Sequence, residues 1–479
     1  MNVMNYWVLL CTSSTVCCAQ SIITRGPYLN NSDTKATIRW RTDSPTNSVV
    51  TIGAATYTNS LQTTEHIVKI TGLTPNSHYS YRIGSTSYTF PVDTNYHFHT
   101  APVSGSYVRP VTVIGIGDFG VSTTAQNDVE NVLPQQADVW QWYGDNAYPI
   151  GSAAEYEAHA FGPHYRNHYP KLNLLPSLGN HDAVSSSPTT QTGPYFEYFS
   201  LPSSGEYGGV ASNTAAYYSY NYGHVHFIVL ESTEAPFRSA TGAMANWLRQ
   251  DLQADKSLWR VVYFHHPPFS KGSHNSDLEI DMVEMRQNIV PILEQYGVDL
   301  VLTGHCHGYE RSHFMHGFYG TSSQFNDSYR LSSGTGFPEP YQKTNKGAVY
   351  AVVGTGGVAL KGSGIHNAMA TSVFNKYGFA KMTFTRDSLW FQFIGTDKQV
   401  VDQFIIRKVQ PCPDQLVFSS PPHLGTQSFE AHLTITSTNQ TAKGSAISYS
   451  AGKSVELKPG FSTSSGSIFQ ATVGGCNPP

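Results

Sequence analysis

The stretch VTVIGIGDFG at residues 111–120 decides the fold class of the central part of the chain. Its apolar, β-branched residues up to Ile116 are typical of a buried strand, which the Gly-Asp pair then ends. Apolar residues at helical spacing follow between residues 125 and 133, and a second apolar run covers residues 139–143. This alternation of strands with amphipathic helices continues to about Lys408 and predicts an α/β domain.

Short polar motifs follow the apolar runs of this region, at the point where each predicted strand ends. They are GDFG at 117–120, GDNAY at 144–148, GNHD at 179–182, VYFH at 262–265 and GHCH at 304–307. Sites in open α/β sheets form at the carboxyl ends of the strands. We therefore expect one residue from each motif to meet at a single rim, namely Asp118, Asp145, Asn180, His265 and His305.

Each motif taken alone has an ordinary structural explanation. A Gly-Asp pair after a strand is usually a turn or a helix N-cap. His305 and His307 are more informative, because alternate residues of an extended segment point the same way, whereas Cys306 should then point into the core. The complete set offers two carboxylates, an amide oxygen and three imidazoles, which suit two metal ions that share a bridging ligand.

The order GDxG, GDxxY, GNH, VxxH and GHxH resembles the signature of the metallophosphoesterase superfamily, and within it that of the purple acid phosphatases. The sequence GYER at 308–311 is also similar to that family. The resemblance implies an α/β metallophosphoesterase sandwich, in which β-sheets are flanked by helices. It further implies a dinuclear centre that pairs Fe(III) with a divalent ion, either Zn, Fe or Mn.

The resemblance also implies a role for each motif residue. Fe(III) is expected on Asp118, Tyr148 and His307. The divalent ion is expected on Asn180, His265 and His305, with Asp145 bridging both ions. Tyr148 distinguishes the purple subfamily, because a phenol with a pKa of about 10 is held deprotonated only by a strongly charged ion. The VxxH spacing favours His265 over its neighbour His266.

Two further histidines are expected to face the substrate. His181 follows Asn180, and His274 matches a second substrate-facing histidine of the plant-type members, although Asn275 replaces the histidine beside it. Asp182 stands where a glutamate is common. The implied mechanism is attack of a metal-generated hydroxide on phosphorus, while these two histidines stabilise or protonate the leaving group.

The regions on either side of the α/β domain have a different pattern. Residues 20–103 predict short strands at 36–40, 48–52 and 66–70, and LTPNSHYSY at 73–81 resembles the loop-to-strand corner of fibronectin type III domains. Residues 107–408 are the predicted catalytic domain. Residues 411–479 are rich in Ser, Thr and Gly and predict a small C-terminal β module that looks like those appended to secreted bacterial proteins.

Residues 1–19 predict a secretory signal that is cleaved between Ala19 and Gln20, although a positively charged start is missing. A membrane span and a lipoprotein anchor at Cys17 or Cys18 are the less favoured interpretations, because the apolar run is short and the residues before Cys17 are a poor lipobox. The mature chain is expected to carry no transmembrane segment. Cys412 and Cys476 are candidates for one disulfide in an oxidising compartment.

The sequence therefore predicts a secreted acid phosphatase, in an extracellular, periplasmic or cell-surface location, that hydrolyses phosphate monoesters of small molecules. The formal net charge of -4 argues against a broadly basic nucleic-acid binder. One alternative is a phosphodiesterase or nucleotide pyrophosphatase that uses two divalent metals, with Tyr148 as a bystander. Another is a surface-binding protein whose β modules act and whose phosphatase domain is degenerate.

Overall fold

The structure is a computed structural model that describes residues 21–91, 93–331, 335–362, 364–409 and 413–475. The predicted signal segment and the predicted Cys412–Cys476 pair lie outside these ranges. The chain divides into two compact units, Met1–Leu331 with Gly347–Phe404, and Ser332–Lys346 with Ile405–Pro479. Within the described ranges, no helix combines the length and the apolar character that crossing a bilayer requires.

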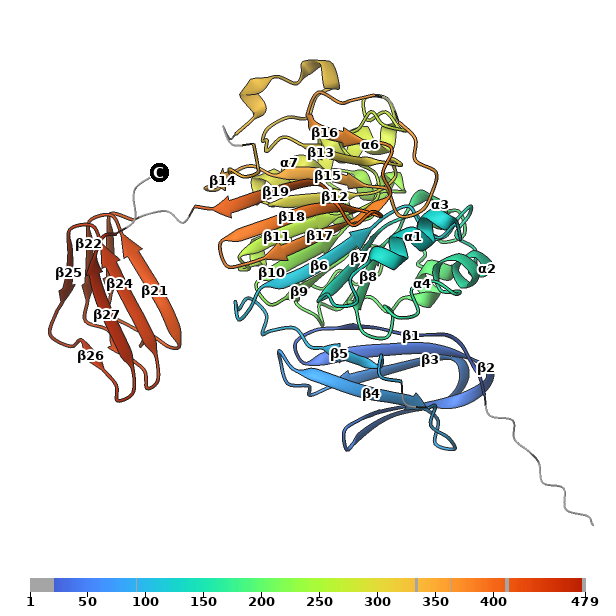
Figure 1. Cartoon of the computed structure of the whole chain (residues 1–479), viewed down its shortest axis with the longest axis horizontal. Coiled ribbons are helices and arrows are strands. Elements are labelled where there is room, and N and C mark those ends of the chain that lie inside the picture. The colour runs from blue at the N-terminus through green and yellow to red at the C-terminus, as the bar shows by residue number, and fades with distance from the viewer. Residues whose placement is uncertain (1–20, 92, 332–334, 363, 410–412, 476–479) are drawn as a thin grey trace, which may run out of the picture. The chain divides into compact units, whose positions relative to one another are not determined.

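The α/β region of the first unit contains two large sheets. In the first sheet the strands run in the order β19-β18-β17-β6-β7-β8, with β6, β7 and β8 parallel and β17 antiparallel to β6 (Figure 1). Their bounds are β6 Val111–Ile116, β7 Val139–Tyr143, β8 Asn173–Ser177, β17 Gly378–Phe384, β18 Ser388–Gly395 and β19 Val400–Lys408. Strands β6 and β7 coincide with the apolar runs at 111–116 and 139–143 that predicted them.

The second sheet has the order β16-β13-β15-β12-β11-β10-β9, and its central strands β10, β11, β12 and β15 are parallel. Its bounds are β9 Tyr218–Tyr222, β10 Val225–Val229, β11 Trp259–Tyr263, β12 Leu300–Thr303, β13 Tyr309–Ser312, β15 Val349–Val353 and β16 Met369–Val373. Buried tyrosines join the two sheets. The Tyr263 hydroxyl donates to the Leu175 carbonyl at 3.0 Å, and its ring lies 5.8 Å from that of Tyr143.

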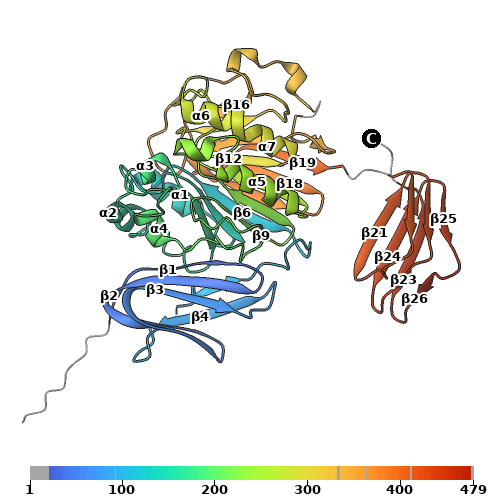
Figure 2. The ribbon, with the colours of Figure 1, turned by 180° about the vertical axis from the view of Figure 1, so that it is seen from behind.

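Helices cover both outer faces, so the predicted metallophosphoesterase sandwich of sheets flanked by helices is confirmed (Figures 1 and 2). The helices that follow the first-sheet strands are α1 Thr124–Val132, α2 Ala153–Glu155, α3 Asn180–Ala183 and α4 Pro194–Tyr198, with a π-turn η1 at Tyr156–Ala160. On the second sheet, α5 Ala243–Ala254 buries Met244 and Leu248 against Ile228 and Val262. Short 3₁₀ turns lie at η2 Ala235–Arg238, η4 Ser322–Gln324 and η5 Asp327–Tyr329.

The helical segment around Pro291 is irregular. It consists of α6 Ile280–Glu284, a π-turn η3 Met285–Ile289 and α7 Val290–Gln295. Pro291 is the second residue of α7, where its missing N–H costs no helical hydrogen bond.

The N-terminal region is a sheet of five strands, β1 Ile23–Asn31, β2 Lys35–Ile52, β3 Ala55–Thr71, β4 His78–Gly84 and β5 His97–His99. The separate strands predicted at 36–40 and 48–52 are one strand, β2, whose pairing with β3 shifts register around Thr46. Such shifts are β-bulges, which bend a strand without ending it. Tyr79 accepts a hydrogen bond from the Thr74 amide at 2.8 Å, as a tyrosine corner does. The fibronectin III-like assignment stays a prediction.

The N-terminal sheet continues the first sheet of the α/β region, because β1 pairs in parallel with β8 at Leu29 and Asn173. Arg25 on β1 is ion-paired with both Glu65 and Glu157, and its guanidinium carbon lies 4.0 Å from the centre of the Tyr198 ring. These contacts bind the N-terminal region to the segment that includes η1 and α4.

The second unit contains a small β-helix. Its strands are β20 Gln415–Phe418, β21 Thr426–Ala431, β22 Thr434–Ser437, β23 Gln440–Thr441, β24 Ala446–Ala451, β25 Ser454–Leu457, β26 Ser462–Thr463 and β27 Ile468–Val473. They form three parallel sheets, β20-β22-β25, β21-β24-β27 and β23-β26. In the same unit β14 Tyr341–Lys343 pairs with residues 406–408 of β19. The prediction of a C-terminal β domain is confirmed.

Candidate metal centre

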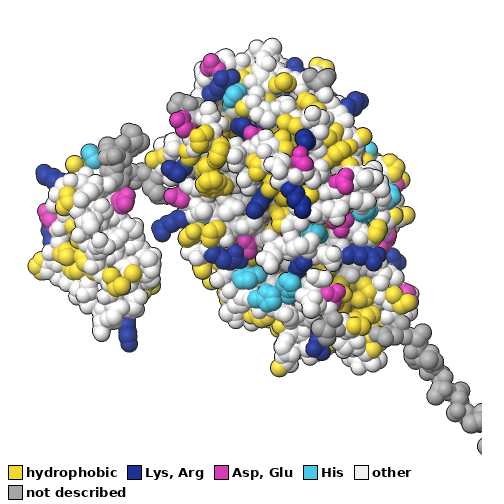
Figure 3. Space-filling model, viewed as in Figure 1, with side chains coloured by type: hydrophobic (Ala, Val, Ile, Leu, Met, Phe, Trp, Pro, Cys, Tyr) yellow, Lys and Arg dark blue, Asp and Glu magenta, His cyan; other side chains and the backbone are white. Residues whose placement is uncertain are grey.

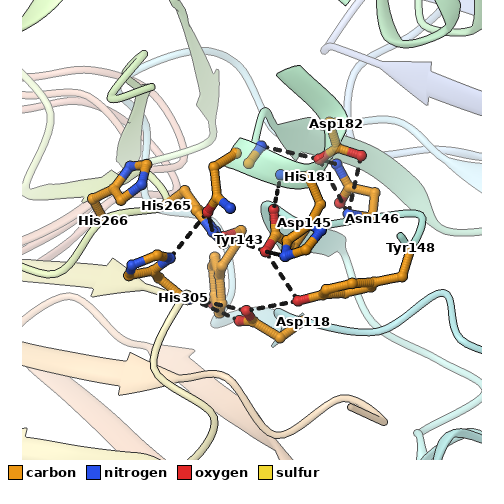
Figure 4. Close-up of polar contacts among 12 residues, drawn as sticks. Asp118, Tyr143, Asp145, Asn146, Tyr148, His181, Asp182, His265, His266 and His305 are labelled. Atoms are coloured by element: carbon orange, nitrogen blue, oxygen red, sulfur yellow. Dashed lines mark hydrogen bonds and ion pairs between the residues drawn. The ribbon is translucent and has the colours of Figure 1, made fainter. Parts of the chain in front are cut away.

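The five polar motifs all lie at the carboxyl ends of parallel strands. Asp118, Asp145 and Asn180 follow β6, β7 and β8 of the first sheet. His265 and His305 follow β11 and β12 of the second sheet. Figure 4 shows side chains from both sheets converging on one site. The expectation that the strand ends deliver these groups to one rim thus agrees with the geometry.

The backbone at three of these residues is in the left-handed region. The φ angles of Asp118, Asp145 and His305 are 57°, 53° and 69°, and each residue follows a glycine. Non-glycine residues adopt this conformation at a cost of about 1–3 kcal/mol, and such strain is concentrated at functional sites. The turn lifts each side chain off the end of its strand and into the site.

Tyr148 lies between the two carboxylates. Its hydroxyl donates to Asp145 Oδ2 at 2.9 Å and is 3.2 Å from Asp118 Oδ1. Burial, with the charges of Asp145 and then Asp118, raises the pKa of Tyr148 well above its ordinary value. A phenolate here therefore needs strong positive charge at the same place, which a highly charged metal ion supplies.

Asn180 lies between two imidazoles on the other side of Asp145. The amide oxygen Oδ1 is 2.9 Å from His265 Nε2 and 3.0 Å from His305 Nδ1. His265 Nε2 is also 3.2 Å from Asp145 Oδ2. Because His265 Nδ1 lies 2.9 Å from the Tyr143 carbonyl oxygen, which only accepts, Nε2 is the ring nitrogen left for a metal.

His307 lies on the Asp118 and Tyr148 side of the site. Its Nε2 is 3.7 Å from Asp118 Oδ1, and its ring centre is 6.4 Å from that of Tyr148. The seven predicted ligands thus form two groups on either side of Asp145. Asp118, Tyr148 and His307 make one group, and Asn180, His265 and His305 make the other.

The electrostatics of the site fit bound cations. Burial raises the pKa of Asp118 to about 8, and the Asp145 carboxylate adds to the rise. Burial opposes protonation of His265, but Asp145 outweighs it and raises the pKa of His265 to about 9. Asp118, Asp145 and His265 also bring ligand atoms within 4.8 Å of one another. Buried oxygens and imidazole nitrogens that require positive charge are a donor set suited to a dinuclear metal centre.

His181 lies at the solvent side of this centre. Its backbone amide donates to Asp145 Oδ1 at 2.8 Å, and its ring centre is 4.3 Å from that of Tyr148. Ring Nδ1 lies 2.6 Å from the Pro149 carbonyl oxygen, and Nε2 lies 3.9 Å from Asp145 Oδ2. The side chain is 35% exposed, so a substrate can reach it.

His274 lies over His305, with ring centres 3.8 Å apart. Glu279, which was not among the predicted residues, holds both rings. Its Oε2 is 2.8 Å from His274 Nδ1 and 3.7 Å from His305 Nε2. The contact with His305, followed by others, lowers the pKa of Glu279 to about 2. No motif spacing in the sequence marks this glutamate.

His266 and Asp182 are not predicted ligands, but they contact residues next to the site. His266 Nδ1 lies 2.9 Å from Ser232 Oγ, and its ring centre is 4.4 Å from that of His305. Asp182 accepts hydrogen bonds from the Gly179 amide at 2.9 Å and from the Asn146 side chain at 2.9 Å, which ties together the turns that follow β8 and β7. Burial raises the pKa of Asp182 to about 6. The choice of His265 over His266 as the ligand stays a prediction.

Cys306 has a structural place. It is fully buried among Met282 and Val352, and Ser270 Oγ lies 3.0 Å from its sulfur.

The fold is that of the metallophosphoesterases. Residues 111–309 match the calcineurin-like phosphoesterase family, and this segment contains every predicted site residue. The resemblance to the purple acid phosphatases within that class is confirmed by the relatives. Purple acid phosphatase 15 of Arabidopsis thaliana is 27% identical over 278 residues, which are 53% of this chain and 50% of that protein. Purple acid phosphatase 23 of the same plant is 28% identical over 272 residues, 51% of this chain and 57% of that protein.

The chain spans about half the length of these curated relatives. Two solved structures share the fold. A purple acid phosphatase, PPD1, from yellow lupin (Lupinus luteus) seeds has a TM-score of 0.61 at 18% identity, covering 80% of this chain and 74% of its own. PhoD has a TM-score of 0.60 at 12% identity, covering 80% of this chain and 90% of its own.

Proposed function

We propose that the chain is a secreted purple acid phosphatase that hydrolyses phosphate monoesters at a centre of Fe(III) and a divalent Zn, Fe or Mn ion. The observation that supports this most directly is the Tyr148 hydroxyl, 2.9 Å from Asp145 Oδ2 and 3.2 Å from Asp118 Oδ1. A phenol at this point adds a hard anionic ligand to a site that otherwise resembles those of other metallophosphoesterases. The names of the Arabidopsis relatives are in line with the proposal.

In this proposal Asp118, Tyr148 and His307 hold Fe(III), and Asn180, His265 and His305 hold the divalent ion, with Asp145 between them. The bound pair supplies an acidified water as nucleophile and positive charge for the phosphate oxygens. Five positive metal charges face three anionic ligands, so the site stays attractive to a phosphate monoester although the chain is acidic.

His181 acts on the leaving group. Nδ1 donates to the Pro149 carbonyl, which holds the ring with Nε2 toward the site. A proton on Nε2 can pass to the alkoxide as the phosphorus–oxygen bond breaks. His274 faces the same substrate, oriented by Glu279.

The remaining regions have accessory roles in this proposal. Residues 1–19 are a signal peptide, and the protein acts in an extracellular, periplasmic or cell-surface location. Residues 20–103 form a fibronectin III-like domain, 107–408 the catalytic domain, and 411–479 an accessory β module. The substrates are phosphorylated small molecules.

The test is a visible absorption spectrum combined with hydrolysis of an aryl phosphate by metal-loaded protein. We expect a phenolate–Fe(III) charge-transfer band that Tyr148→Phe abolishes while bound metal is retained. His181→Ala should lower turnover by about 100-fold with little change in metal content. Colourless, active protein that prefers an aryl phosphodiester would instead indicate a phosphodiesterase with two divalent metals. Inactive protein with full metal content would favour the surface-binding alternative.

A further inference from the structure

A cavity lies at the opposite ends of the strands that carry the first-sheet ligands. It has a volume of about 490 Å³, and Thr112 at the start of β6, Asp138 before β7 and Leu172 before β8 line it. Asp118, Asp145 and Asn180 follow the other ends of the same three strands. The cavity is therefore separate from the metal centre.

Three histidines of the N-terminal sheet open into this cavity. His78 on β4 and His99 on β5 are paired across the two antiparallel strands, and His97 lies two residues before His99. Residues at alternate positions and in direct cross-strand pairs share one face of a sheet, so the three imidazoles project together. The rings of His78 and His97 are 5.0 Å apart. Figure 3 shows histidine side chains gathered on this face of the molecule.

The carboxylate that lines the cavity is already paired with a cation. Arg109 donates to both oxygens of Asp138, at 2.7 and 2.9 Å. Arg109 Nη2 also lies 3.2 Å from His99 Nδ1, and the Lys171 ammonium lies 2.8 Å from Gln135 Oε1. Asp138 is thus the carboxylate among the lining residues, and Arg109 already pairs with it, so a charged imidazole adds positive charge that the lining does not compensate.

The histidines are close enough to repel one another when charged. Burial, with the charges of His97 and His99, lowers the pKa of His78. His97 Nδ1 lies 2.9 Å from the Thr94 carbonyl oxygen, an acceptor that keeps the hydrogen on Nδ1. Nε2 is therefore the remaining ring nitrogen, and in the charged ring it is an additional N–H donor. Like charges placed opposite each other destabilise a sheet unless an anion lies between them.

We propose that this cavity binds a phosphate or sulfate group, free or carried as an ester on a polymer, when His78 and His97 are protonated. The N–H donors of protonated imidazoles and the Lys171 ammonium suit the several acceptor oxygens of such a group. Binding strengthens as the pH falls and needs neither the metals nor the phosphatase reaction. The proposal is thus independent of the proposed function.

The test uses the full chain with its metals and fluorescent dextran sulfate, with neutral dextran as the blank and inorganic sulfate as competitor. Fluorescence anisotropy should show affinity about tenfold higher at about pH 5 than at about pH 7.5. The double variant His78→Gln/His97→Gln should lose most of that gain, and the single variant His78→Gln, at an exposed residue, should lose part of it. His432→Gln, a histidine paired with Asp414 in the second unit, is the matched control and should bind as the parent does.

Equal affinity of parent and double variant at about pH 5 would overturn the proposal, as would equal affinity of the parent at the two pH values. Inorganic sulfate that binds in calorimetry while dextran sulfate does not would support the site and identify a free anion as its ligand. One equivalent of Zn²⁺ lost in the double variant, without any sulfate binding by the parent, would replace the anion site with a metal site. Circular dichroism of each variant checks that it is folded, and aryl phosphate turnover should stay at the parent level.

Discussion

Glycines beside the ligands set how closely the motifs approach one another. A β-carbon built on Gly304 would lie 2.4 Å from Asp118 Oδ2 and 2.8 Å from the Tyr143 carbonyl oxygen. One on Gly179 would lie 2.1 Å from the Asp145 amide nitrogen. Real β-carbons do not make contacts this short, so the backbones of the two sheets meet at the site only because these side chains are missing.

Gly304→Ala should therefore displace the Asp118 carboxylate and weaken metal binding by roughly 10- to 100-fold. Metal analysis after dialysis and turnover of an aryl phosphate measure the effect. Gly474→Ala is the matched control, because its β-carbon would meet Ser450 Oγ at 3.6 Å, an ordinary contact. Full metal content and activity in Gly304→Ala would show that Asp118 does not need this close approach.

Site residues within the strand-end motifs could be predicted from the sequence. A site residue whose position depends on the path of a loop could not. Asp118, Asp145 and His305 are each preceded by a strand and a glycine, so their positions at a strand end follow from the pattern. Glu279 meets His274 and His305 only because the chain between β11 and α6 folds back over the site. That loop has no periodicity from which its path could be read.

At the level of strands, the pairing of β1 with β8 makes the N-terminal region part of the main sheet. Arg25 stabilises this junction. Its side chain has no exposed surface and is ion-paired with Glu65 and Glu157. Burial opposes the charge on Arg25, but electrostatic interactions with Tyr28 and then with the carboxylates of Glu157 and Glu65 raise its pKa above the ordinary value.

Arg25→Gln should destabilise the protein by about 1–3 kcal/mol, because it removes the buried charged hydrogen bonds to both carboxylates, although Arg41 still faces them. Thermal or urea unfolding measures the change. Arg41→Gln is the matched control. Arg41 contacts the same two glutamates at 3.2 and 3.0 Å but is 40% exposed, so its loss should cost only about 0–1 kcal/mol. Equal effects of the two substitutions would contradict the role given to burial.

The hairpin of β2 and β3 contains a buried, neutral histidine. His66 Nε2 lies 2.7 Å from Thr42 Oγ1, its Nδ1 lies 2.9 Å from Ser48 Oγ, and its ring stacks on Trp40 at 4.7 Å. Burial lowers the pKa of His66 to about 4. The unfolded chain, with an ordinary histidine pKa of about 6.5, takes up the proton first as the solution is acidified.

His66 should therefore cost stability progressively as the pH falls from about 6.5 to about 4, and cost none above that range. Comparing the free energy of unfolding at about pH 7 and about pH 4.5, the acid-induced loss should be smaller in His66→Gln than in the parent by about 1–3 kcal/mol. An identical pH dependence in parent and variant would contradict this. His432→Gln, with its side chain 38% exposed, should leave the dependence unchanged.

A strand predicted from a regular apolar pattern agrees with the structure, whereas the predicted end of a strand at turn-forming residues does not. The run at 111–116 is β6 as expected. The turn-forming residues Ser44, Pro45 and Asn47 predict a loop, yet all lie inside β2. Its bulges accommodate them while the strand stays paired with β3. Whether such residues end a strand depends on the partner strand, which the local sequence does not include.

At the scale of the whole molecule, the two units differ in whether they contain predicted site residues. Every predicted site residue lies between Asp118 and His307 in the first unit, whereas the β-helix belongs to the second. A chain that ends at residue 409 keeps β19 and all seven predicted ligands. It should retain metal content and aryl phosphate turnover within about twofold of the full chain, measured side by side. A large loss of turnover with metal retained would assign the β-helix a part in catalysis.

The α/β class and the position of the centre could be predicted, but the composition of the first sheet could not. Strands β17 and β18, at residues 378–395, pair beside β6 from residues 111–116. They carry no catalytic motif, and contacts between residues so far apart in sequence leave no local signal. The ligands come from two different sheets because β6–β8 and β11–β12 belong to separate sheets, a division that the local sequence does not show.

The β-helix has a consequence for how its length can change. Partner residues on successive coils are 19 to 22 positions apart, as in Gln415 and Thr434, or Ala446 and Ile468. An insertion of about 20 residues adds one further rung and repeats the stacking of Tyr449 on Phe469, which are 5.1 Å apart. An insertion of about half that size puts inward-facing side chains on the outside. In evolution or by engineering, this module should therefore change its length only in steps of one whole coil.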